Sequence, residues 1–352
     1  MAGLRFVRFD DPHAFLAESK DFDDSFMNFG LGSLYDFLSG ASTQVVSDAP
    51  LRMFAVYRGK DLLITLHTNK TSRFWVLSTP CPAHEALTGD PELLASATAL
   101  LAHSVLAEPA DPAALDKVCG PPEAVNAFLA TWTALLLAHH NPVKLLDGNF
   151  DTHVSYATKT SLPPLPSPPS PYVVELATPA DLEPAAALYQ DFQANAPWRA
   201  VLTKEQAMAA LADPLAARLL WLCRLEPDGP PAAYVALGRV TPRTVAIRNV
   251  YVAPAYRRRG VAEAAVRAVT RYYLGAPPYG VRGVPDGPPA CGVKEEVNLN
   301  VGDASAEGVY RRSGFLFPSG YGEGAQGGVD PVTGRWAWQR SILVEVKIDT
   351  ES

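Results

Sequence analysis

A proline-rich segment, SLPPLPSPPSPY at residues 161–172, divides the chain near its middle. Repeated proline fixes φ and removes backbone N–H donors, so this segment enters neither a helix nor the middle of a sheet. A chain of 352 residues also exceeds the usual size of one domain. We therefore expect a first domain at 1–160, an extended linker at 161–171 and a second domain at 172–352.

Composition places the chain among folded globular proteins. Hydrophobic residues make up 48% and charged residues 19% of the sequence, which excludes a disordered or fibrous chain. The formal net charge is −7, so the chain lacks the broad positive field that attracts nucleic acid or acidic lipid. We expect neither nucleic acid nor a membrane as a partner.

No segment predicts export or membrane insertion. The acidic start MAGLRFVRFDDPHAF lacks the apolar core of a signal peptide, and the richest apolar stretch, residues 128–138, is too short to span a bilayer. The cysteines stand far apart, which suggests neither a disulfide framework nor a zinc site. They are Cys81, Cys119, Cys223 and Cys291. We expect a cytoplasmic protein without a bound metal, as a monomer or a homodimer.

The second half alternates strand and helix signals. Apolar residues alternate over 172–178, which predicts a strand, and a helix start follows at once. Thr203 opens a capping-box pattern, which predicts a second helix that stops before Pro214. The remaining expected elements are three strands within 219–254, a helix over 262–273, a strand over 295–301, a helix from Asp303 to Gly314 and a final strand over 335–348.

The first half has a similar order of parts. Residues 51–80 indicate a strand meander, and helices are expected over 91–106 and 122–138. No turn of arginine and glycine joins a strand to a helix in this half. The two halves therefore suggest related domains that differ at one turn.

That turn lies in AYRRRGVAEAAV, residues 255–266, between the last of the three strands and a helix. The N–H groups at a helix start have no intrahelical partner, and Gly260 lets a ligand approach the backbone without a Cβ in the way. Arg257, Arg258 and Arg259 add positive charge beside them. The pattern predicts a pyrophosphate site.

Two other interpretations of the turn remain open. A solvated basic turn is one, although cations at a helix N-terminus oppose the macrodipole. A nucleic-acid patch is the other, although the following helix adds only Arg267 and Arg271. A nucleotide P-loop is excluded because the turn lacks the Gly-Lys-Ser/Thr ending.

The segment NVYVAPAYRRRGVA, residues 249–262, resembles motif A of the GCN5-related N-acetyltransferase (GNAT) superfamily. Arg257, Gly260 and Ala262 fill its pattern of arginine, two residues, glycine, one residue, and glycine or alanine. The segment EEVNLNVGDASAEGVYRRSGF, residues 295–315, is similar to motif B.

The two motifs stand in the family's order, and the resemblance covers residues 172–348. It implies an α+β fold, with a mixed, mostly antiparallel central sheet flanked by helices. CGPPEAVNAFLATW, residues 119–132, is similar to a helix entry in two-part members. The first half would then be a degenerate GNAT-like domain in tandem with the second.

The resemblance also implies acetyl-CoA as the co-substrate. Its pyrophosphate would lie on the turn, and its pantetheine arm would lie along the preceding strand, which splays from the strand after Glu295. Asp303 stands where many members carry an asparagine that touches the cofactor, and Tyr310 matches the tyrosine that protonates the leaving thiolate. The implied cofactor-binding residues are Val250, Tyr251, Val252, Arg257, Arg258, Arg259, Gly260, Val261, Ala262 and Asp303.

The general base is not identified by the sequence. All seven histidines lie in the first half. Glu295 and Glu296 begin a strand near the expected site, and Asp191 lies on the first helix of the second half, but a solvated charged face explains them equally well. A GxGxxG pattern at 322–327 has no helix after it, so it indicates a loop beside the acceptor rather than a dinucleotide site.

The implied activity is an acyl-CoA-dependent N-acetyltransferase, in which a small amine attacks the thioester directly within a ternary complex. Loops at 276–292 and 318–334 are expected to close over a compact acceptor. A protein or peptide acetyltransferase is the alternative if these loops border an open groove. A non-catalytic acyl-CoA-binding sensor remains open because no base is evident.

Overall fold

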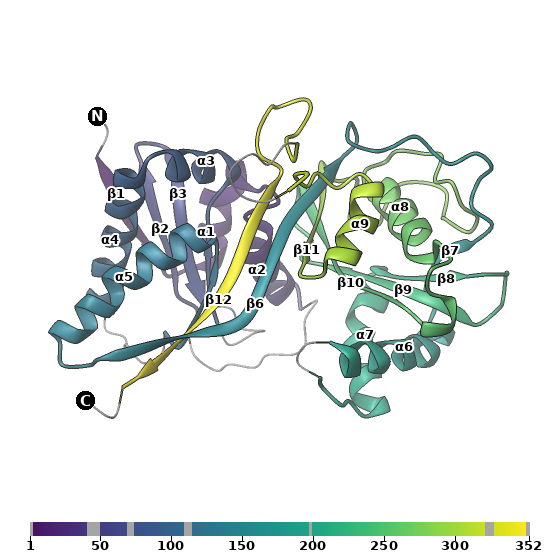
Figure 1. The fold of residues 1–352 in the computed structure, drawn as a ribbon, viewed down its shortest axis with the longest axis horizontal. Coiled ribbons are helices and arrows are strands. Elements are labelled where there is room, and N and C mark those ends of the chain that lie inside the picture. The colour runs from purple at the N-terminus through teal and green to yellow at the C-terminus, as the bar shows by residue number, and fades with distance from the viewer. Residues whose placement is uncertain are drawn as a thin grey trace.

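The computed structural model of the chain describes residues 3–40, 50–68, 74–108, 115–196, 199–320 and 327–349. These residues form a twelve-stranded sheet in the order β1-β2-β3-β4-β5-β12-β6-β11-β10-β9-β8-β7, with helices on both faces (Figure 1). Neighbouring strands are antiparallel except β4 with β5 and β10 with β11. The predicted class, a mixed and mostly antiparallel sheet flanked by helices, is confirmed.

The first half supplies the strands and helices up to the proline-rich segment. Helices α1 and α4 each begin after an aspartate that precedes a proline. Asp11 and Asp90 accept hydrogen bonds from N–H groups of the first helical turn. The elements are β1 (Leu4–Phe9), α1 (Pro12–Ser19), α2 (Asn28–Leu38), β2 (Met53–Arg58), β3 (Asp61–Thr68), β4 (Trp75–Ser78), α3 (Cys81–Gly89), α4 (Pro91–Ala107), β5 (Lys117–Gly120), α5 (Pro122–Ala138) and β6 (Val143–Thr158).

The second half repeats this order from a strand through two helices to three strands. Its elements are β7 (Val173–Leu176), α6 (Leu182–Asn195), α7 (Lys204–Ala216), β8 (Leu220–Arg224), β9 (Pro231–Gly238), β10 (Thr244–Val252), α8 (Val261–Tyr273), β11 (Glu296–Val301), α9 (Ala304–Arg312) and β12 (Trp338–Ile348). The prediction that α7 stops before Pro214 is wrong, since the helix runs to Ala216. A proline in the last turn removes only one intrahelical hydrogen bond, which a helix end tolerates.

The last strand of each half pairs across the junction between the halves. β6 pairs with β11 of the second half, whereas β12 lies between β5 and β6 of the first half. Figure 1 shows these two long strands crossing the centre of the molecule side by side. The strand over 335–348 was expected to close the second domain, and instead it joins the sheet of the first. The division at 161–171 stays a prediction, because one sheet runs through both halves.

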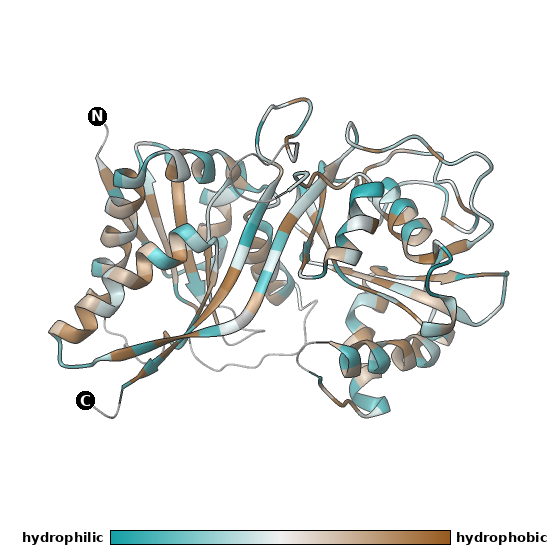
Figure 2. Cartoon of the chain, in the orientation of Figure 1, coloured by the Kyte–Doolittle hydropathy of each residue, from teal (hydrophilic) through white to brown (hydrophobic). Residues whose placement is uncertain are grey.

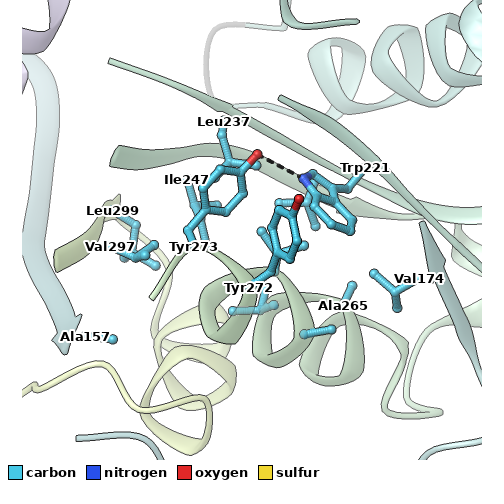
Figure 3. Packing of buried hydrophobic residues seen from close by; sticks show 14 of the residues in the cluster. Ala157, Val174, Trp221, Leu237, Ile247, Ala265, Tyr272, Tyr273, Val297 and Leu299 are labelled. Carbon is cyan, nitrogen blue, oxygen red and sulfur yellow. Dashed lines mark hydrogen bonds between the residues drawn. The ribbon is translucent and has the colours of Figure 1, made fainter. Parts of the chain in front are cut away.

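Separate hydrophobic clusters stabilise the two halves. In the second half, α8 packs its apolar side on the sheet, where Trp221 Nε1 donates a hydrogen bond to Tyr273 Oη at 3.3 Å (Figure 3). In the first half, Phe128 and Trp132 of α5 stack within a second buried cluster. The long strands between them carry hydrophilic residues as well as hydrophobic ones (Figure 2). In the described residues, no helix has the length and apolar character needed to cross a membrane.

Candidate active site

Strands β10 and β11 lie side by side for only part of their length. Their parallel pairing begins at Thr244 and Glu296 and ends at Ile247 and Leu299. Beyond this point β10 pairs with β9 and β11 pairs with β6. The end of β10, residues 250–252, therefore has a main-chain edge that β11 does not cover. An extended, amide-containing ligand can pair with such an edge as a strand would.

Gly260 shapes the turn that follows β10. It is the N-cap residue of α8 and has a φ of 80°, a left-handed conformation that favours glycine. A Cβ placed there would have no atom within 4 Å, so the space in front of the turn is open. The first intrahelical bond is donated by Ala264 N to Gly260 O at 3.0 Å. The N–H groups at the start of α8 are therefore available to an anion.

The three arginines of the turn have different places. The Nε of Arg257 donates to Val252 O at 3.0 Å, and its guanidinium lies 5.4 Å from the centroid of the Tyr251 ring, so this side chain fixes the end of β10. Arg258 lines the open cleft beside Gly260. The carbonyl oxygen of Arg259 accepts a hydrogen bond from the Tyr172 hydroxyl. The side chain of Arg259 does not line the cleft.

The cleft has a volume of about 380 Å³ and lies between the turn and α9. Its first wall comes from the end of β10, the turn and the start of α8. Its second wall comes from one face of α9. The lining residues are Val252, Tyr256, Arg257, Arg258, Gly260, Val261, Ala262, Glu263, Ser305, Val309 and Arg312.

The second wall was not identified from the sequence. Ser305, Val309 and Arg312 are four and three residues apart, a spacing that places side chains on one face of a helix. That spacing was the available signal. It does not say what the face meets, because α9 and α8 are brought together only by packing. Tyr256 and Glu263 of the first wall were also missed.

Ion pairs join the two walls. Arg312 Nε lies 2.7 Å from Glu263 Oε2, and Arg267 lies 3.1 Å from Glu263 Oε1. Arg267 also donates to the carbonyl oxygen of Arg312 at 2.6 Å. The carboxylate of Glu263 is thus balanced by two cations, and Arg257 and Arg258 make the cleft locally positive within an acidic chain.

Asp303 acts as the N-cap of α9. Its Oδ1 accepts hydrogen bonds from Ala306 N at 2.8 Å and from Ser305 Oγ at 2.6 Å. The bond from Ser305 holds the pKa of Asp303 below its ordinary value. Asp303 does not line the cleft, but it fixes Ser305, which does.

Tyr310 follows Val309 on α9. Its ring meets the ring of Phe315 edge-on at 5.8 Å between centroids, and burial raises the pKa of the phenol above its ordinary value. The hydroxyl therefore stays protonated at neutral pH, as a proton donor requires. Neither Tyr310 nor Val250 lines the cleft, and Tyr251 packs on the opposite face of the sheet with α6.

The first half covers the face of β10 and β11 that lies opposite α8. Asn28 Nδ2 donates to Thr244 Oγ1 at 2.7 Å and to Arg239 O at 2.8 Å. Ser25 N donates to Glu296 Oε2 at 2.9 Å. These contacts lie at the paired start of β10 and β11, before the point at which the two strands separate.

The carboxylates considered as bases differ in their surroundings. Asp191 is exposed. Glu295 has a side chain 62% exposed and pairs with Arg243 at 2.7 Å. Glu296 instead points toward the first half and is partly buried. Among the described side chains, no group of three or more His, Cys, Asp or Glu residues is arranged to hold a metal ion.

Two loops, at 276–292 and 318–334, were expected to close over the acceptor. The loop at 276–292 packs along the outer strand β7, where Val174 N donates to Arg282 O at 2.9 Å. Since β7 is three strands away from β10, this loop does not close over the split strands, and that expectation is wrong. Part of the second loop, residues 321–326, lies outside the described residues, and with it most of the GxGxxG pattern. Beyond it, Trp336 N donates to Glu85 Oε1 of α3 at 2.7 Å.

Residues 185–281 match the model of the Acetyltransferase (GNAT) family. The second half therefore contains a GNAT-family domain. No curated protein matches the chain.

Several solved structures are similar to nearly the whole chain at low sequence identity. A tandem GNAT protein from the clavulanic acid biosynthesis pathway is 11% identical, with coverage of 99% of this chain and all of the other, and a TM-score of 0.46. A GCN5-related N-acetyltransferase from Sphaerobacter thermophilus is 15% identical, with coverage of 98% and 96% and a TM-score of 0.45. One from Kribbella flavida is 14% identical, with coverage of 90% and 95% and a TM-score of 0.40.

Proposed function

Because residues 185–281 form a GNAT-family domain, we propose that the protein is an N-acetyltransferase that moves the acetyl group of acetyl-CoA to the amine of a small molecule. The observation that carries this proposal is the cleft at Gly260. It joins an open helix N-terminus to the uncovered edge of β10. A diphosphate with an extended amide chain matches both parts.

The residues present fit acetyl-CoA. The N–H groups that follow Gly260 would hold the pyrophosphate, with Arg258 and Arg257 beside them. The edge of β10 at residues 250–252 would pair with the amides of the pantetheine arm. When bound, acetyl-CoA supplies a thioester whose acetyl group is activated for transfer.

Side chains of this half support the chemistry. The split between β10 and β11 would orient the acyl group at the point where the acceptor arrives, so the reaction gains from proximity within a ternary complex. The protonated hydroxyl of Tyr310 would supply the proton that the leaving sulfur needs. The main-chain N–H near Val252 would polarise the carbonyl.

The cover provided by the first half favours a compact acceptor. Ser25 and Asn28 make direct contact with β11 and β10 on the side opposite α8. A protein substrate would need an open groove at this position. A small amine needs no groove along this covered part of the sheet and fits the arrangement better.

Calorimetry with acetyl-CoA, followed by thiol release with a panel of small amines and peptides, tests the proposal. We expect binding at one site per chain and release with a small amine. Release with peptides alone would assign the protein acetyltransferase activity instead. Binding without release from any acceptor would indicate a sensor, and absence of binding would overturn the proposal.

A further inference from the structure

The face of β11 opposite α8 carries an unusual row of polar side chains. Val297 and Leu299 belong to the hydrophobic cluster beneath α8. Side chains alternate along a strand, so Glu296, Asn298 and Asn300 share the other face. They lie at intervals of about 7 Å, and the row runs along the strand past the point where β10 and β11 separate.

The two asparagines have donors without partners. Asn298 is 1% exposed, and its Nδ2 has no hydrogen-bond partner among the described residues. The Nδ2 of Asn300 is also buried, and the described part of the chain gives it no partner either. Buried polar groups are almost always hydrogen-bonded, to ordered water where the protein offers nothing. These donors therefore mark a polar track beside the split.

Glu296 stands at the far end of this track and is held there by the first half. Ser25 donates twice to its Oε2, from N at 2.9 Å and from Oγ at 2.5 Å. No described residue donates to its Oε1. One carboxylate oxygen is thus fixed, and the other is left to accept a proton.

We propose that Glu296 is the proton acceptor for the incoming amine, reached through water held by Asn300 and Asn298. This inference rests on the proposed function and supplies a base that the sequence did not identify. The acyl group would lie at the split, with acetyl-CoA on the α8 side, so the acceptor approaches from the face that carries the track. The first half then serves the reaction by holding the base.

The proton transfer balances in one step. The acceptor enters as an ammonium ion; one of its N–H bonds breaks, and an O–H bond forms on Glu296 after relay through the water chain. The neutral amine keeps the electron pair for attack. The carboxylic acid afterwards returns its proton to solvent.

The charged surroundings of Glu296 suit this task. The pKa of Glu296 is raised to about 7, chiefly by burial and also by the nearby carboxylate of Asp24, whereas the hydrogen bonds from Ser25 and the charge of Arg243 oppose the rise. Tyr156 of β6 and Cys81 of α3 also lie close enough to interact with Glu296, and the pKa of each is raised above its ordinary value. A base with a pKa near 7 exchanges protons efficiently at neutral pH.

The first test compares pH–rate profiles of the wild type, Glu296→Gln and Glu295→Gln. The acceptor is an alkylamine whose own pKa is above about 9. A rise of kcat/KM near neutral pH, the limb of the profile, therefore reports a group of the protein. We expect kcat/KM of the wild type to rise with pH and level off above about 7. Glu296→Gln should lose this limb and at least about 10-fold in plateau rate, with unchanged binding of acetyl-CoA by calorimetry. Glu295→Gln, at the exposed neighbouring position, should keep the wild-type profile.

A second variant retains the carboxyl group. Ser25→Ala removes a hydrogen bond that favours the charged form, so the limb should move to higher pH. A residue of the first half would then shift the pH profile of chemistry in the second, which a purely structural contact would not do. An unmoved limb in Ser25→Ala, or a retained limb in Glu296→Gln, would overturn the inference.

Unfolding provides a readout without turnover. A carboxyl whose folded pKa is raised contributes stability below its unfolded pKa and loses it as pH rises through the folded value. The free energy of unfolding of the wild type, measured with urea, should therefore fall between about pH 4.5 and about pH 7. The slope should be shallower in Glu296→Gln, and equal slopes would contradict the assignment. Wild-type protein without thiol release from any amine would instead refute the proposed function.

Discussion

The two halves place the same element order around different helix starts. In the second half, α8 begins at Gly260, with open space in front of it. In the first half, α3 follows β4, and Cys81 N at its start donates to Asp24 Oδ2 at 2.7 Å. The position that would take a phosphate is thus occupied by the chain's own carboxylate. A helix N-terminus binds a ligand only where the rest of the fold leaves it uncovered.

The strands beside these helices also differ: they separate in the second half and stay in contact in the first. β10 and β11 separate after Ile247. At the corresponding end of β4 and β5, a Cβ on Gly120 would lie 2.3 Å from Leu77 O, so the strands stay in close contact. The first half therefore has no room for an extended ligand between these two strands.

The largest expected effect comes from blocking the open helix start at Gly260 in the second half. Gly260→Asp places a carboxylate where the pyrophosphate would lie, and like charges in contact cost several kcal/mol. Affinity for acetyl-CoA should fall by at least about 100-fold in calorimetry. Gly287→Asp is the matched control, because Gly287 also has a positive φ and open space around its Cβ position. Equal affinities in the two variants would contradict the assignment of the cleft.

The next variant distinguishes a loss of catalytic rate from a loss of acetyl-CoA affinity in the second half. Tyr310→Phe removes a proton donor but keeps the ring packed on Phe315. We expect kcat to fall by about 100-fold, as for loss of a general acid, with little change in the Kd for acetyl-CoA. Steady-state rates together with calorimetry check this, and equal turnover would remove Tyr310 from the mechanism.

Gly120→Ala tests the close strand contact of the first half. Its methyl group would collide with Leu77 O, and overpacking of this kind costs about 2 kcal/mol. Urea unfolding should show that loss. Gly89→Ala is the control, since nothing lies within 4 Å of its Cβ position. If both variants unfold alike, the strands of the first half are less tightly joined than the structure indicates.

Asp24→Ala gives the smallest effect and tests the occupied helix start. Loss of the carboxylate that accepts from Cys81 N should cost about 1 kcal/mol, as for other helix caps. The acetyl-CoA stoichiometry should stay at one per chain, because Gly120 and Leu77 still hold the strands together. A second binding site in calorimetry would show that Asp24 alone closes the first half.

Most of the second half could be predicted because its signals are local. Thr203 and Gln206 form their capping box, and Asp303 begins α9 through a bond to a residue three positions away. The face of α9 that completes the cleft could not be predicted in the same way, since Arg312 meets Glu263 across 49 residues. The position of the loop at 276–292 could not be predicted for a related reason: its length is visible in the sequence, but its packing along β7 is not.

The helix caps, the strand pattern and the arginine–glycine turn follow from the sequence alone, because each depends on neighbours within a few residues. Three features depend on the assembled fold: β12 joins the first half, Asp24 covers a helix start 57 residues away, and Ser25 holds Glu296 across 271 residues. These contacts form between side chains that the chain brings together only when the whole sheet is assembled.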